Sequence, residues 1–145
     1  MKAHNTLLVL YLVMLAPFVS ADLVLVANPS SGIEHLTKSE IINIYLGRYR
    51  RLSTGSTAVP VDLAENSGNA ENKAIFYRQL VNKNLAEINA YWSRLVFSGK
   101  TRPPKQVSNI EEALEFVANN PNALAYIDRS AVNSQVIIVY EWPDS

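Results

Sequence analysis

Short apolar segments rich in β-branched residues alternate with amphipathic segments along most of this 145-residue chain, and this alternation limits its possible folds most. Residues 22–27 (DLVLVA) and 57–63 have the composition of buried strands. Two more strands are expected near the end, over 123–127 and 135–140. Strands that alternate with helices favour an α/β layer fold, built on a mostly parallel sheet with helices on both faces.

The helical segments carry recognisable start and stop signals. Three of them begin with capping-box spacing, in which a polar N-cap residue is followed three residues later by Glu; the pairs are Thr37–Glu40, Asn84–Glu87 and Ser108–Glu111. A further helix is expected over about 69–81. Gly47 and Gly99 follow two of the helices, as C-terminal stops do. The proline-rich segment 100–104 is expected to be irregular.

Residues 1–21 have the three parts of a secretory signal peptide: a short polar start with Lys2, an apolar stretch over 7–19 and a small-residue cleavage site. The alternative is a membrane anchor, but the apolar run is shorter than the ~20 residues a spanning helix needs. We therefore expect cleavage after Ala21, one domain over 22–145 and no membrane span in the mature chain. Because the chain has no cysteine, an exported form fits a bacterial periplasm.

The charge balance excludes a general nucleic-acid binder. The chain has 13 basic residues (Lys and Arg) and 13 acidic residues, and signal cleavage would remove only Lys2 from this balance. A nucleic-acid-binding domain typically shows a basic excess.

Catalytic chemistry has little support in the sequence. His35 is the only histidine beyond the signal peptide, so neither a catalytic triad nor a usual zinc site can be assembled. Asp62, Glu65 and Asp128 lie near strand ends, where carboxylates are more often capping or solvated groups than catalytic pairs. We expect a non-enzyme without metal or cofactor.

The loop at 66–69 (NSGN) precedes a helix and is a candidate anion site. Free backbone N–H groups at a helix N-terminus favour an anion, and Lys73 is the nearby cation in sequence. Glu65 and Glu71 flank the loop and would repel an anion. The alternative is an ordinary turn, because the same residue types are preferred at turns and N-caps.

Residues 48–51 (RYRR) form the densest positive cluster. Arg48, Arg50 and Arg51 are candidate contacts for an acidic protein partner. The alternative is a solvated loop after a helix end, where cations complement the helix dipole.

The order of several motifs resembles the substrate-binding proteins of phosphate ABC transporters, which are type 2 periplasmic binding proteins. Residues 44–47 (IYLG) are similar to that family's Ile-(Phe/Tyr)-Leu-Gly signature. Residues 91–92 (YW), 97–99 (FSG) and 121–126 (PNALAY) resemble further family segments in the same order. The resemblance runs from about 24 to 140 and implies the fold of a single lobe.

The resemblance also implies a ligand site. Full members have two lobes that clamp the anion, whereas this chain has length for one lobe and resembles the second. Their phosphate loop, Arg-Ser-Asp-Gly-Ser-Gly-Thr, falls where LAENSGNAEN stands. Matching its Ser-Gly pair to Ser67 and Gly68 makes Asn69 the equivalent of its Thr, whereas anchoring on Phe76 of the following helix puts residues 72–73 there. The ligand residues that the resemblance implies are Ser67, Gly68, Asn69 and Lys73. No Arg begins the loop and no Thr closes it, so weak phosphate binding or none is expected.

Two functions follow from these observations. The first is a periplasmic lobe that binds phosphate or a similar small oxyanion, linked to phosphate ABC transport and completed by a second copy or another protein. The second is a periplasmic scaffold or interaction protein that has kept the lobe and lost the ligand, with Arg48, Arg50 and Arg51 as its contacts.

Overall fold

The computed structural model describes residues 22–66, 68 and 70–143. The predicted signal peptide, together with Ser67 and Asn69, lies outside the described residues. In chain order the elements are β1 (Leu23–Ala27), α1 (Lys38–Tyr45), β2 (Val59–Leu63), α2 (Ala70–Val81), α3 (Leu85–Ser98), β3 (Lys105–Val107), α4 (Ile110–Asn119), β4 (Ala123–Asp128), the short 3-10 helix η1 (Arg129–Ala131) and β5 (Ile137–Glu141).

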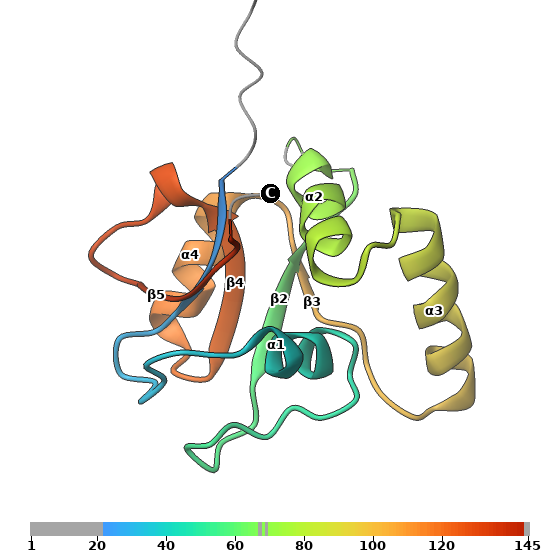
Figure 1. Cartoon of the computed structure of the whole chain (residues 1–145), viewed down its shortest axis with the longest axis horizontal. Helices are drawn as coiled ribbons and strands as arrows, with labels where there is room; N and C mark the ends of the chain where they lie inside the picture. Colours follow the sequence, from blue (N-terminus) through green and yellow to red (C-terminus); the bar gives the residue numbers. More distant parts are fainter. Residues whose placement is uncertain (1–21, 67, 69, 144–145) are drawn as a thin grey trace, which may run out of the picture.

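The strands form one five-stranded sheet in the order β3-β2-β4-β1-β5 (Figure 1). Strand β2 pairs in parallel with β3 and β4, whereas β1 pairs antiparallel with β4 and β5. All strands except β1 therefore point the same way, which confirms the predicted mostly parallel sheet.

Helices cover both faces of this sheet, as predicted. Helix α4 lies behind the strands in Figure 1, and α1 and α2 cover the other side. All five residues of β1 are buried, because the strand has a neighbour on each edge and helices above and below. On the α1–α2 side, Phe76 stacks on Tyr126 with 3.9 Å between ring centroids.

The predicted helix boundaries are confirmed for α1 and α3 and wrong by one residue for α4. Thr37 and Asn84 each form the complete capping box. In α4 the N-cap is Asn109, whose side chain accepts from the Glu112 N–H, rather than Ser108 with Glu111. Ser108 and Asn109 are both residue types that cap helices well. The helix that begins at Ile110 buries Ala113 and Val117 against the sheet.

Strand β3 was missed in the sequence. Two of its three residues are exposed, so it lacks the apolar composition of a buried strand. Its backbone pairs in parallel with 61–63 of β2, and this pairing extends the sheet at its edge. The preceding segment, 101–104, has no regular structure, as predicted. Within the described residues, no helix is long and apolar enough to cross a membrane.

Gly47 lies where α1 ends against α3, and we predict that alanine there destabilises the fold. Its φ is +67°, and an added Cβ would lie 2.7 Å from Thr101 Oγ1 and 2.9 Å from Trp92 Cη2. Gly99→Ala is the matched control, because Gly99 has nearly the same φ, +69°, and open space around it. The left-handed backbone alone costs roughly 1–2 kcal/mol with a side chain. Overpacking adds about 1–3 kcal/mol at Gly47.

Chemical denaturation measures both variants. Gly47→Ala is expected to lose more unfolding free energy than Gly99→Ala, and equal losses would contradict the close packing of Gly47.

Candidate functional site

A buried carboxylate, Asp62, lies near the carboxyl end of β2 and collects donors from two other elements. Its exposed fraction is 4%. Tyr77 of α2 donates its hydroxyl to Oδ2 at 2.7 Å, and Tyr126 of β4 donates to Oδ1. The Nζ atom of Lys73, also on α2 and 3% exposed, lies 3.6 Å from Oδ2. The four side chains form a closed polar cluster, which we call the Asp62 cluster.

The electrostatics of the Asp62 cluster are set by burial. Burial raises the pKa of Asp62, while the Lys73 ammonium and the hydroxyls of Tyr126 and Tyr77 act in the opposite direction. Burial and the nearby Asp62 charge raise the pKa of both tyrosines well above the ordinary value. The phenols therefore remain protonated donors, and the positive charge of Lys73 is matched inside the protein by Asp62.

The position of the cluster in the sheet is one that favours ligands. Strands β2 and β4 are parallel neighbours, and the chain leaves β2 toward β3 at one edge and leaves β4 toward β5 at the other. In α/β sheets, ligands bind outside the carboxyl ends of strands at such a switch point. Asp62 and Tyr126 lie near these ends, and the loop between β2 and α2 follows directly.

The structure places the predicted anion ligands in different environments. Gly68 is exposed, whereas Ser67 and Asn69 lie outside the described residues. Lys73 points into the protein and pairs with Asp62, a contact that was not anticipated from the sequence. Glu65 and Glu71 are exposed on the two sides of the loop, as sequence reasoning placed them. An anion-binding role for Ser67, Gly68, Asn69 and Lys73 stays a prediction.

Of the three carboxylates considered at strand ends, one was misjudged. Asp128 caps η1 by accepting from the Ser130 N–H, and Glu65 is exposed and accepts from Asn89. Asp62 is neither a cap nor solvated, because α2 places two donors over it. A single acidic residue in the otherwise apolar run VPVDL, with Lys73 and Tyr77 four residues apart on the next helix, is the signal for it.

The arginine segment 48–51 follows the C-terminal end of α1. Arg50 is half-buried, and its guanidinium donates to two backbone carbonyls, from Nε to Ile44 O at 3.0 Å and from Nη2 to Arg102 O at 2.8 Å. Arg48 and Arg51 are exposed. Arg50 thus holds the segment in place, while a partner-binding role for the three arginines stays a prediction.

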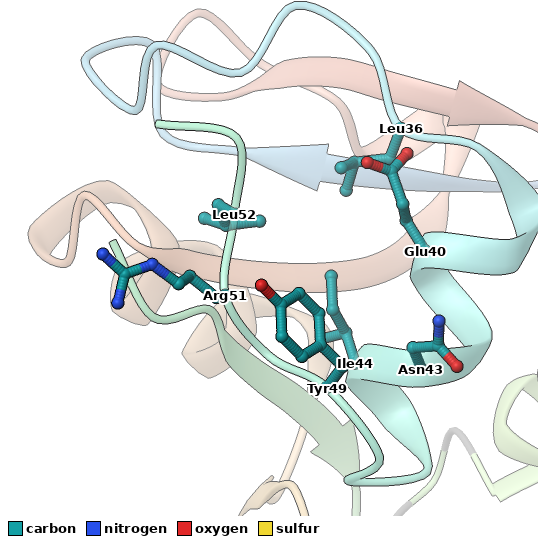
Figure 2. Close-up of a pocket in the computed structure, with 7 residues that line it drawn as sticks. All are labelled: Leu36, Glu40, Asn43, Ile44, Tyr49, Arg51 and Leu52. Carbon is teal, nitrogen blue, oxygen red and sulfur yellow. The ribbon is translucent and has the colours of Figure 1, made fainter. Parts of the chain in front are cut away.

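Beside this segment the surface has a small hollow of about 60 Å³, which we call the Tyr49 hollow. It is lined by Leu36, Glu40, Asn43, Ile44, Tyr49, Arg51 and Leu52. Figure 2 shows the Tyr49 ring beside Ile44, with Arg51 on one side and Glu40 on the other.

The part of the chain that the structure describes contains no group of side chains arranged as a metal site. His35 is exposed, and no group of three or more His, Cys, Asp or Glu side chains in this part of the chain is arranged to hold a metal ion.

Comparison with known proteins bears on the fold. No family model and no curated protein matches the chain, but solved structures do. An ABC-type phosphate transport receptor from Vibrio cholerae matches with a TM-score of 0.62 and 15% identity over 81% of this chain. A putative phosphate ABC transporter substrate-binding protein from Clostridium perfringens, with bound phosphate, matches with a TM-score of 0.60 and 21% identity over 81% of this chain. PstS from Borrelia burgdorferi matches over the same share of the chain with a TM-score of 0.58 and 14% identity.

The fold is that of a phosphate ABC transporter substrate-binding protein lobe. This confirms the resemblance seen in the motifs. The chain spans less than half of each matched structure: 45% of the Vibrio cholerae receptor, 44% of the Clostridium perfringens protein and 46% of Borrelia burgdorferi PstS. At such low identities the likeness concerns the fold.

We predict that Asp62→Asn destabilises the protein through Lys73. The substitution leaves a buried ammonium without its counter-charge, which typically costs about 3–5 kcal/mol. Replacing both residues, as Asp62→Asn with Lys73→Met, removes the unpaired charge and should recover much of that loss. Urea denaturation of the two variants measures the difference.

Glu65→Gln is the matched control, because Glu65 is an exposed carboxylate on the same loop. It should change the unfolding free energy by no more than about 0.5 kcal/mol. A double variant no more stable than Asp62→Asn would contradict the pairing.

Proposed function

We propose that this chain is a non-catalytic, periplasmic binding-protein-like lobe that acts by contacting another protein and has lost tight anion capture. The Lys73–Asp62 pair carries this proposal. Tight phosphate recognition needs several charge-assisted donors that are free to meet the ligand. Lys73, the cation nearest to the loop in sequence, instead lies 3.6 Å from an internal carboxylate.

The charges around the loop support the same proposal. Asp62, Glu65 and Glu71 contribute three negative charges when ionised, against the single positive charge of Lys73. Glu65 and Glu71 are exposed, so an approaching anion meets their field before it meets the loop. The backbone N–H groups at the start of α2 favour an anion, but a helix terminus contributes only about 0.3–1 kcal/mol at an exposed site.

A second candidate function is weak binding of phosphate or a similar oxyanion, associated with phosphate ABC transport. The loop between β2 and α2 follows the switch point of the sheet, where ligands bind in related folds. The Clostridium perfringens protein, which shares this fold, holds phosphate. In this function Ser67, Gly68, Asn69 and Lys73 would contact the anion, and a second copy or another protein would complete the site.

Isothermal titration calorimetry with sodium phosphate tests the proposed function. We expect no binding heat with phosphate up to millimolar concentration, because the donor charge is already neutralised by Asp62. Sodium chloride at equal ionic strength serves as the control, and circular dichroism confirms that the protein is folded.

A saturable heat with phosphate at or below millimolar concentration would overturn the proposal and support the second candidate. In that case Ser67→Ala should weaken the affinity, and Ser53→Ala, an exposed serine in the turn before β2, should leave it unchanged.

A further inference from the structure

We propose that the Tyr49 hollow is the contact site for the partner, and that it binds an acidic, extended peptide segment carrying a small aliphatic side chain. This inference rests on the proposed function, since it names the surface and the chemistry of the partner.

The hollow has an apolar floor and an aromatic wall. Leu36, Ile44 and Leu52 are at most 7% exposed and form its base. Tyr49 stands beside Ile44 with 61% of its surface exposed, although large aromatic side chains are usually covered (Figure 2). A volume of about 60 Å³ suits a small aliphatic group rather than a ring.

The charged side chains around the hollow differ in the hydrogen bonds that they form within the protein. Glu40 accepts from the Thr37 N–H at 2.7 Å and from the Thr37 hydroxyl at 2.8 Å within the capping box. These hydrogen bonds lower the pKa of Glu40 and stabilise its charge at the N-terminus of α1.

The two exposed arginines of the segment 48–51, Arg48 and Arg51, supply its exposed positive charge. Among the described residues, no carboxylate lies within ion-pair distance of Arg48 or Arg51. Arg51 therefore presents a positive charge without a carboxylate partner in the described part of the chain. It lies on the side of the hollow away from Glu40, and this side complements an acidic partner.

The segment that carries Tyr49 and Arg51 is fixed before any partner binds. The backbone N–H groups of Arg48 and Tyr49 both donate to Asn43 O, and Ala58 N–H donates to Arg50 O. The guanidinium of Arg50 adds its two bonds to backbone carbonyls. Because the site is already ordered, binding does not have to include the cost of ordering this loop.

Together these features match the composition of hot spots in protein–protein interfaces, where Tyr and Arg are enriched in well-packed pockets. A free inorganic anion would use Arg51 but leave the apolar floor uncovered. A carboxylate carried two residues away from an aliphatic side chain uses both, because alternate residues of an extended peptide project to the same side. This chemistry points to an acidic peptide segment.

The test uses residues 22–145 of the chain and a fluorescein-labelled peptide with the sequence Glu-Ser-Val-Ser-Glu, in which Val and both Glu side chains project to the same side when the peptide is extended. Fluorescence anisotropy at low salt should show saturable binding. Arg51→Ala and Tyr49→Ala should each weaken it about tenfold, whereas Arg78→Ala, an exposed arginine on α2, should leave it unchanged. A peptide with Gln in place of Glu should bind at least tenfold more weakly.

No binding of the labelled peptide would overturn the inference, as would equal losses in Arg51→Ala and Arg78→Ala. Either result leaves the phosphate titration, and with it the proposed loss of anion capture, unaffected. Conversely, tight phosphate binding together with an Arg51-dependent peptide contact would refute the loss of anion capture and retain the hollow as a docking site.

Discussion

The buried carboxylate of Asp62 joins the parts of the molecule that surround the loop between β2 and α2. Lys73 and Tyr77 reach it from α2, and Tyr126 reaches it from β4. The Tyr126 hydroxyl also accepts from the Leu63 N–H, and this hydrogen bond ties the last residue of β2 to β4. A carboxylate in this position would be costly without such donors. The loop is therefore anchored on both sides by one charged group.

The cations near the Asp62 cluster and in the arginine segment differ in their surroundings. Lys73 pairs with Asp62 inside the fold, and the Arg50 guanidinium donates to two backbone carbonyls. Both side chains therefore stabilise the structure. Arg48 and Arg51 are exposed, and Arg51 lines the Tyr49 hollow. The charge of Lys73 is thus paired inside the fold beside the loop between β2 and α2, whereas Arg48 and Arg51 lie on the surface after the C-terminal end of α1.

Much of the fold was predictable because its signals are local. Capping boxes at Thr37 and Asn84 and the apolar run of β1 report on neighbouring residues, and the structure confirms them. Strand β3 and the Asp62 cluster were missed because both depend on residues distant in sequence. The exposed residues of β3 become a strand only through pairing with β2, and the environment of Asp62 exists only once α2 lies over the sheet.

The place of β1 in the sheet affects how the chain can fold. It is the first strand in sequence but an interior strand in space, with Leu23 opposite Asp128 and Val24 opposite both Ile127 and Glu141. A fully apolar strand therefore has no partner until the end of the chain has been made. Pairings between residues so far apart form slowly. During that interval the unpaired, apolar β1 can associate with other chains.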